Sequence, residues 1–206
     1  MFHVLRKSRA GGAILSDVNN ELFFITSNEH KFREVSQILK AYNVNIKWYK
    51  VKYTEIQADQ IEEIAFQSAK LLATRLNFDF FLEDTGLFIE TLNGFPGPFS
   101  AYVYRTIGNN GILRLLQHVE NRNAYFKTCV AYYDSREKTI HTFVGVMEGR
   151  ISYKIRGEQW GFDPIFIPKG YKKTYAEMGS EKNKISHRTK AIEKFALWYV
   201  KNIKKT

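Results

Sequence analysis

The sequence predicts a mixed α/β fold with antiparallel hairpins in its second half. The first part of the chain alternates short apolar strands with helical patterns, whereas residues 123–147 hold two apolar strands around a polar turn. A chain of 206 residues with 44% hydrophobic content can form one large core or two smaller ones. No linker or repeat divides it, so we expect one domain over residues 21–206, preceded by an extension of unknown role at residues 1–20.

Apolar periodicity justifies the elements of the first half. Leu22 to Ile25 is a continuous apolar run, which is typical of a buried strand, and Val35, Ile38 and Leu39 then recur on one helical face. The expected elements are a strand at Leu22 to Ile25, a helix at His30 to Ala41, a strand at Val44 to Val51 and a helix at Ile61 to Leu76 that is capped near Asp59.

Strand and turn patterns dominate the second half. The Ser135-Arg136 pair between two apolar runs predicts a hairpin, and Ser186 is the expected N-cap of the last helix. The expected elements are strands at Phe80 to Leu82 and Leu87 to Thr91, a helix at Gly111 to Val119, hairpin strands at Asn123 to Asp134 and Thr139 to Met147, a further strand at Arg150 to Ile155 and a helix over Ala191 to Tyr199.

The most informative stretch is Leu82 to Leu87, where two carboxylates follow an apolar run and precede a glycine. We expect the strand to break into a turn here, which would leave Glu83 and Asp84 partly desolvated at a strand end. Paired carboxylates in such a place hold a metal or activate water. The alternative is a solvated acidic turn.

Three other polar clusters interrupt apolar runs. Thr26 to Lys31 lies between a strand and a helix N-terminus, which forms a natural anion site; the alternative is an ordinary N-cap by Ser27 or Asn28. Trp160 to Pro164 places Asp163 in an extended conformation before proline, and its rings offer a stacking surface or a plug between strands.

The third cluster is Lys182 with Ser186, His187 and Arg188. Cations at a helix N-terminus oppose the helix dipole, and a bound anion would resolve that conflict.

Together these clusters resemble the inosine/xanthosine triphosphate pyrophosphatase family. The resemblance covers residues 22–199 and rests on motifs that occur in family order: T-S-N-E-H-K (26–31), E-I-Q-A-D (55–59), L-E-D-T-G-L (82–87), F-P-G-P (95–98), W-G-F-D-P (160–164), Y-A-E-M (175–178) and E-K-N-x-x-S-H-R (181–188). It implies an elongated mixed sheet flanked by helices, two lobes with the nucleotide cleft between them, and a homodimer. It also implies Mg²⁺-dependent hydrolysis of deaminated purine nucleoside triphosphates to a monophosphate and pyrophosphate.

The resemblance also assigns roles to the residues of the motifs. Glu55 and Asp84 would bind the metal, Asp84 would also be the base for water, and Glu83 would act beside it. The expected substrate-binding residues are Thr26, Ser27, Asn28, Glu29, His30, Lys31 and Thr85, with Lys182 also at the phosphates, and Trp160, Gly161, Phe162, Asp163, Ser186, His187 and Arg188 at the base, where Phe162 is the expected stacking ring.

The sequence departs from the family pattern at three positions. A phosphate-contacting lysine is common in the helix after the acidic motif, but Gln67 and its neighbours stand there and Lys70 is the nearest cation. Some relatives carry a lysine after the P-G-P turn, where this chain has Phe99-Ser100-Ala101. Trp160 stands where the family often has phenylalanine.

Composition leaves one rival function open. The formal net charge of +10 and 15% aromatic content suit a basic nucleotide- or RNA-binding protein without turnover, although the lysines are spread along the chain and nucleic acid is not the expected partner. The single cysteine, Cys129, is expected to be a core residue. No apolar run approaches the roughly 20 residues of a membrane span, so we expect a cytoplasmic protein.

Overall fold

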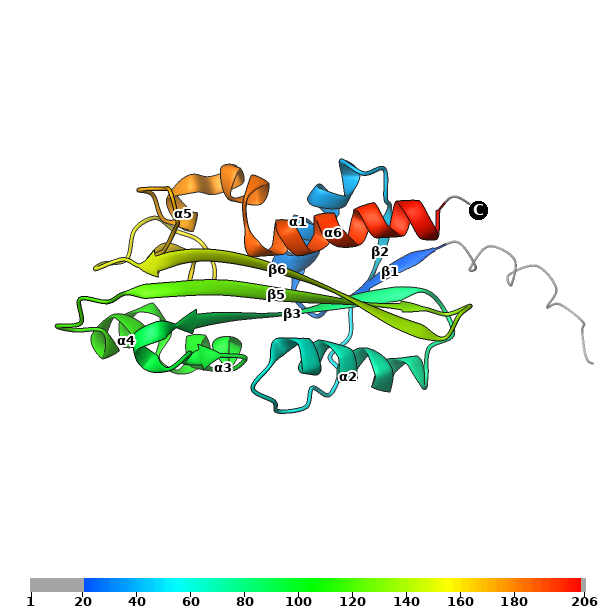
Figure 1. The fold of residues 1–206 in the computed structure, drawn as a ribbon, viewed down its shortest axis with the longest axis horizontal. Coiled ribbons are helices and arrows are strands. Elements are labelled where there is room, and N and C mark those ends of the chain that lie inside the picture. The colour runs from blue at the N-terminus through cyan, green and yellow to red at the C-terminus, as the bar shows by residue number, and fades with distance from the viewer. Residues whose placement is uncertain (1–20, 205–206) are drawn as a thin grey trace, which may run out of the picture.

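A long mixed sheet forms the backbone of the molecule (Figure 1), in a computed structural model that describes residues 21–204. The extension expected at residues 1–20 lies outside the described residues. In chain order the elements are β1 (Leu22–Ile25), α1 (Glu29–Lys40), β2 (Ile46–Tyr49), α2 (Ile61–Ala73), β3 (Phe80–Ile89), β4 (Pro96–Gly97), α3 (Ser100–Thr106), α4 (Gly108–Leu115), β5 (Asn123–Asp134), β6 (Thr139–Ile151), β7 (Phe166–Pro168), α5 (Tyr175–Met178) and α6 (His187–Asn202), with 3₁₀ turns at Glu90–Leu92, Asp163–Ile165 and Gly179–Lys184.

The sheet has the strand order β2-β1-β3-β5-β6-β7, and β4 pairs with β3 outside this path. β1 is parallel to β2 and β3, while the long strands β3, β5 and β6 are antiparallel. These three strands follow the long axis of the molecule, with α6 on one face and α2 on the other (Figure 1). The expected elongated mixed sheet flanked by helices is confirmed. None of the helices within residues 21–204 is long and apolar enough to cross a membrane.

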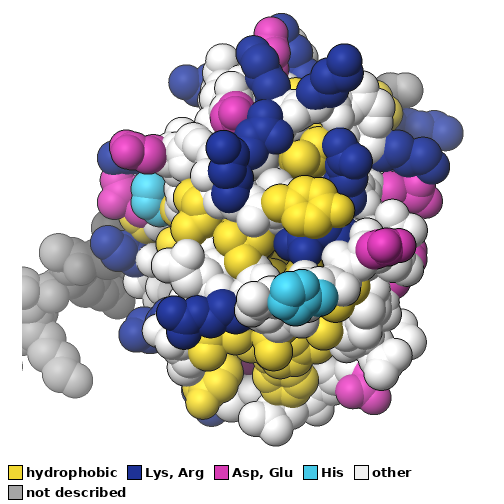
Figure 2. All heavy atoms as spheres, turned by 90° about the vertical axis from the view of Figure 1, so that its left-hand side faces the viewer, with side chains coloured by type: hydrophobic (Ala, Val, Ile, Leu, Met, Phe, Trp, Pro, Cys, Tyr) yellow, Lys and Arg dark blue, Asp and Glu magenta, His cyan; other side chains and the backbone are white. Residues whose placement is uncertain are grey.

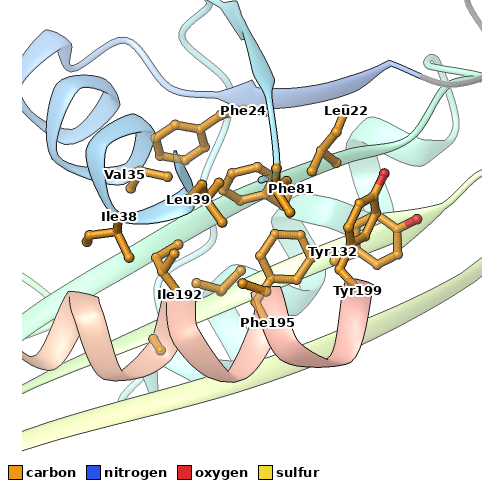
Figure 3. Close-up of a cluster of buried hydrophobic side chains, with 14 residues drawn as sticks. Leu22, Phe24, Val35, Ile38, Leu39, Phe81, Tyr132, Ile192, Phe195 and Tyr199 are labelled. Carbon is orange, nitrogen blue, oxygen red and sulfur yellow. The ribbon is translucent and has the colours of Figure 1, made fainter. Parts of the chain in front are cut away.

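The hydrophobic core lies on both faces of the sheet. On the α6 face, Phe24, Phe81 and Tyr132 from the strands meet Leu39 of α1 and Phe195 of α6 (Figure 3). On the α2 face, a second cluster joins Phe80, Leu82 and Cys129 to helix residues such as Ile61 and Ala65. Cys129 is fully buried, as expected.

The expected turn between Glu83 and Gly86 is wrong, because β3 runs unbroken through this segment. Glu83 pairs with Val130 of β5 and Asp84 with Cys129, so the hydrogen-bonded ladder overrides the turn signal. Gly86 instead allows β4 to pack closely against β3, because a Cβ at this position would lie 2.6 Å from the carbonyl oxygen of Gly97 in β4.

The continuous strand sends the two carboxylates to opposite faces of the sheet, because side chains alternate along a strand. Glu83 falls on the α6 face with Phe81, and Asp84 on the α2 face with Leu82. β1 pairs only with Phe80 and Phe81 of β3 and ends at Ile25, so both carboxylates lie just beyond the point where this neighbour stops.

Other expectations shift at their boundaries. β1 and β5 match their expected limits, and the side chain of Ser186 caps α6 by accepting a hydrogen bond from the Thr189 N–H. The helix expected over residues 61–76 ends at Ala73 with Gln60 as its N-cap, and the one expected over residues 111–119 begins at Gly108 and ends at Leu115.

Two expectations in the second half need correction. The strand expected over residues 150–155 is only the end of β6 at Ile151, while α3 and β7 were not anticipated. Asp163 begins a 3₁₀ turn and is not extended, although proline follows it, since Pro164 occupies an early position of the turn where its missing N–H costs nothing.

α6 packs closely along β6. A Cβ at Gly145 of β6 would lie 2.1 Å from the carbonyl oxygen of His187, so only glycine permits this approach. β6 has no strand partner beyond β5 from Thr139 to Glu148 in the described chain. Along this free edge, Lys190 Nζ donates to the carbonyl oxygen of Val146 at 2.9 Å and Lys194 Nζ to that of Val144 at 2.7 Å.

Candidate functional site

A cavity of about 550 Å³ opens beside β3, next to the loop that follows β1. Its volume is in the range of about 300–1,000 Å³ that small-molecule sites occupy. Most of the expected site residues line it: Thr26, Ser27, Asn28, Lys31, Glu55, Glu83, Asp84, Thr85, Trp160, Gly161, Phe162, Asp163, Lys182, His187 and Arg188.

A smaller cavity of about 210 Å³ shares Trp160, Asp163 and Lys182 with the first and is lined by His30. Glu29 and Ser186 line neither cavity: Glu29 forms an exposed ion pair with Arg33, and the Ser186 hydroxyl caps α6.

The loop after β1 is ordered by its own side chains. Thr26 Oγ1 accepts a hydrogen bond from the Asn28 N–H at 3.1 Å, and Asn28 Oδ1 accepts from the Lys31 N–H at 3.2 Å, which makes Asn28 the N-cap of α1. The Lys31 ammonium lies 3.3 Å from Glu83 Oε1. The N-terminus of α1 therefore faces the cavity with its cap in place and a neutralised lysine beside it.

Asp84 has a buried carboxylate oxygen that lacks a hydrogen-bond partner in the described chain. This oxygen is Oδ2, while the other oxygen accepts a hydrogen bond from the Thr85 N–H at 2.9 Å. Burial raises the pKa of Asp84 to about 6; Lys31 opposes this rise, and the nearby carboxylates of Glu55 and Glu83 add to it.

A divalent cation suits this arrangement of oxygens. No group of three or more Asp, Glu, His or Cys side chains within residues 21–204 forms a ready-made metal site. Mg²⁺, however, is usually held by one or two carboxylates together with substrate phosphates. An unpartnered buried oxygen on Asp84 near Glu55 fits such a cation.

A chain of alternating charges runs from the α1 loop to the 3₁₀ turn at Asp163. Arg188 Nε donates to both oxygens of Glu83 at 2.9 and 3.0 Å, and its Nη1 donates to Glu34. Lys182 Nζ lies 3.1 Å from Glu34 Oε1 and 2.6 Å from Asp163 Oδ2. Adding the Lys31–Glu83 pair gives three cations and three carboxylates in one buried series.

Glu34 was not anticipated from the sequence. Burial raises its pKa, but Arg188 and Lys182 outweigh burial and lower it to about 2. The available signal was its spacing, because residues 31 and 34 lie on the same face of α1.

The network resolves the electrostatic conflict at the N-terminus of α6 without a bound anion, which corrects the expectation made from the sequence. Arg188 is only 1% exposed and its charge is matched by Glu83 and Glu34. Burial, followed by the neighbouring cations, lowers the pKa of His187 well below its ordinary value. His187 is therefore neutral, and its buried Nδ1 has no hydrogen-bond partner in the described part of the chain.

The two aromatic side chains of the 160–164 motif differ in their exposure. Trp160 is partly exposed and stacks on His30, with ring centroids 5.6 Å apart and planes at 16°; the charged groups of Lys182 and Arg188 each lie 5.6 Å from the Trp160 ring centroid. Phe162, the expected stacking ring, is 4% exposed and belongs to a core cluster. Trp160 is thus the more accessible of the two.

Two further cations line the cavity, Lys52 from the loop after β2 and Arg105 from α3. Neither was anticipated, because that loop carries no periodic signal and α3 was not expected. Lys70 is exposed in the last turn of α2 and does not line the cavity, whereas Ala101 does.

Comparison with known proteins identifies close relatives. A model of the Ham1 family matches residues 22–198. A dITP/XTP pyrophosphatase of Thermococcus kodakarensis is 50% identical over 89% of this chain and 99% of its own length. A dITP/XTP pyrophosphatase of Methanopyrus kandleri is 49% identical over 89% of this chain and 98% of its own length. Among solved structures, a HAM1 protein of Coxiella burnetii has 28% sequence identity and a TM-score of 0.75, and the match covers 86% of this chain and 96% of that chain. The Ham1 protein of Staphylococcus aureus has 25% sequence identity and a TM-score of 0.74, and the match covers 86% of this chain and 97% of that chain.

Proposed function

The chain belongs to the Ham1 family, and from this we propose that it hydrolyses deaminated purine nucleoside triphosphates such as dITP, ITP and XTP to a monophosphate and pyrophosphate. The observation that carries the proposal is a single cavity that joins Glu55, Glu83 and Asp84 to a polar loop and to hydrogen-bonding and aromatic groups. A protein that only binds polyanions gains nothing from carboxylates facing the phosphates.

Glu55 and Asp84 are the proposed ligands of Mg²⁺, completed by substrate phosphates. When bound, the cation neutralises phosphate charge and lowers the pKa of water. The unpartnered Oδ2 of Asp84 supports this assignment.

Asp84 is also the proposed base. Its carboxylate would accept the proton of the water that attacks the α-phosphorus, and a pKa of about 6 suits a base that works near neutral pH. Glu83 faces the other side of the sheet and is held by Lys31 and Arg188, so we assign it a positioning role for those two cations.

The loop after β1 is the proposed phosphate-binding segment. The cap by Asn28 Oδ1 leaves the amide NH₂ of Asn28 as a donor, and Lys31 and the hydroxyls of Thr26 and Ser27 face the same cavity. Thr85 lines the cavity as well, although its hydroxyl hydrogen-bonds to Thr128 at 2.7 Å.

The proposed base pocket combines Trp160, Asp163, His187 and Arg188. A 6-oxo purine presents an acceptor at position 6 and a donor at N1, whereas adenine reverses both. The free Nδ1 of His187 and the Nη2 hydrogens of Arg188, which make no hydrogen bond within the described chain, are available to match the 6-oxo pattern. Trp160 supplies the stacking surface.

The test is pyrophosphate release from ITP, XTP, GTP and ATP, with Mg²⁺ and with EDTA. We expect release to require Mg²⁺ and kcat/KM for ITP and XTP to exceed that for ATP by about 100-fold, because a reversed donor–acceptor pair leaves buried groups unsatisfied. Equal efficiency on ITP and ATP contradicts the base pocket, and release that persists in EDTA contradicts the metal assignment.

Such an activity would keep the nucleotide pool free of deaminated bases, and we expect it in the cytoplasm. We also propose a homodimer, since twofold dimers are the commonest closed assemblies. Large apolar side chains that flank β4 or lie on α3 are exposed, among them Phe99 at 44% and Tyr102 at 61%, and we propose this surface as the dimer interface.

A further inference from the structure

The cations of the main cavity fall into two groups. Lys31, Lys182 and Arg188 are already neutralised within the protein, by Glu83, by Asp163 and Glu34, and by Glu83 and Glu34 respectively. Lys182 and Arg188 are also buried, at 4% and 1% exposure, so neither can leave its carboxylates without exposing an uncompensated charge. These two cations are therefore poor candidates for gripping a highly charged polyphosphate.

Lys52 and Arg105 form the second group. Both line the cavity and are exposed, and neither side chain makes a hydrogen bond or an ion pair within residues 21–204. The Lys52 ammonium and the Arg105 guanidinium can therefore bind an anionic ligand without first breaking an ion pair with a protein carboxylate.

Arg105 stands on a segment that is fixed to the rest of the site, and the neighbours of Lys52, Val51 and Tyr53, pack against the core cluster of the α2 face. The Ser100 hydroxyl joins the start of α3 to β3 and β4, because it accepts from the Leu87 N–H at 2.8 Å and donates to the Gly97 carbonyl at 2.7 Å. Tyr104, the neighbour of Arg105, meets Phe162 edge to face with ring centroids 5.5 Å apart. Lys52 precedes Glu55 by three residues in a loop that contributes both side chains to the cavity.

We propose that Lys52 and Arg105 bind the polyphosphate chain of the substrate, the role that the family resemblance implied for Lys182. The proposal rests on the proposed function. A triphosphate carries several negative charges, and the carboxylates of Glu55 and Asp84 repel it wherever a cation does not intervene. An unpaired guanidinium adds two parallel hydrogen bonds to a phosphate, and an unpaired ammonium adds a mobile point charge.

The experiment measures two quantities on the full-length protein with Mg²⁺ present. One is the affinity for inorganic tripolyphosphate by calorimetry, and the other is steady-state hydrolysis of ITP and ATP. The variants are Lys52→Gln and Arg105→Gln, each compared with a matched control outside the cavity, Lys40→Gln on α1 and Arg114→Gln on α4, both exposed.

We expect Lys52→Gln and Arg105→Gln each to weaken tripolyphosphate binding by about 10-fold or more, to raise KM for ITP in proportion and to flatten the salt dependence of both. The ratio of kcat/KM between ITP and ATP should stay unchanged, because base reading is untouched. The controls should behave like wild type.

Wild-type affinity for tripolyphosphate in both cavity variants overturns the inference, and so does an effect that the matched controls reproduce. If the wild type binds tripolyphosphate through these residues but releases no pyrophosphate from ITP, the proposed function is wrong while the assignment of the two cations holds.

Discussion

At the scale of single residues, the chemistry concentrates on one carboxylate that the fold leaves unsatisfied. Burying Asp84 with a bare oxygen is costly unless a proton or a cation compensates it. The same burial that lifts its pKa also prepares it to bind a metal and to accept a proton. Stability and function therefore pull in opposite directions at this residue.

Replacing Asp84 with asparagine keeps the shape of the side chain but removes its charge and basicity. We expect Asp84→Asn to lower kcat by about 10² to 10⁴-fold. Its thermal midpoint in EDTA should equal or exceed that of the wild type, because a buried charge is lost. Near-normal turnover by a folded variant, judged by circular dichroism, would exclude the assigned role.

The raised pKa of Asp84 also predicts a pH dependence. Folding lifts it from 3.8 to about 6, so the folded chain binds this proton more tightly than the unfolded chain does. In EDTA, the contribution of this group to stability is greatest below its ordinary pKa and is lost as pH rises through about 6. Protons and Mg²⁺ compete for the same oxygens, so apparent Mg²⁺ affinity should fall by about tenfold for each pH unit below that value. The measurement is Mg²⁺ affinity by calorimetry at several pH values between about 5 and 7. An affinity that does not change over this range contradicts the assignment.

At the scale of elements, the site depends on how α1 and α6 are tied to β3. Most of the expected site residues that line the cavity were identified through their resemblance to family motifs, and each of these motifs is a short, local stretch of sequence. Glu34 was missed because its role arises from contacts with Arg188 and Lys182, which lie more than a hundred positions away along the chain. The turn expected at Gly86 failed for the same reason, since pairing with β5 is not encoded within the segment.

Removing the charge of Glu34 tests the ion pairs that link α1 to Arg188 of α6 and to Lys182. Glu34→Gln leaves Arg188 and Lys182 short of a carboxylate, and we expect a loss of about 3–5 kcal/mol in the free energy of unfolding, measured with urea. Glu29→Gln on the same helix removes only an exposed pair with Arg33 and should cost no more than about 1 kcal/mol. Similar losses in the two variants would refute the importance of the buried series.

The contact between α6 and β6 gives a second test at this scale. Gly145→Ala inserts a methyl group against the backbone of His187, which forces the start of α6 away from the strand. We expect a loss of about 1–3 kcal/mol in stability and a fall in the preference for ITP over ATP, because His187 and Arg188 move together. A variant as stable and as selective as the wild type would show that the helix has room to shift.

At the scale of the whole molecule, the question is whether the positive charge marks a binding face. At the end of the molecule seen in Figure 2, lysine and arginine side chains are scattered among apolar and acidic ones. The net charge of +10 therefore does not mark one binding face on this side. Overall architecture followed from the sequence more readily than element boundaries did, because the alternation of apolar runs is a property of the entire chain.

Assembly is the property to test at this scale. We expect the protein to sediment as a dimer at about twice the chain mass of 24.1 kDa. Tyr102→Glu places a charge in the exposed apolar surface of α3 and should shift the equilibrium to the monomer. A wild type that stays monomeric at micromolar concentration rules out the dimer, and a dimeric variant rules out this surface.

The two lysines that α6 extends over β6 affect how readily the protein aggregates. A long strand with an open side is a template on which another chain can add a strand, and such addition leads to aggregation. Lys190 and Lys194 occupy carbonyl oxygens of Val146 and Val144 and place positive charge along that side. The helix that carries His187 and Arg188 into the cavity thus also hinders strand addition by other copies of this protein at the open side of β6.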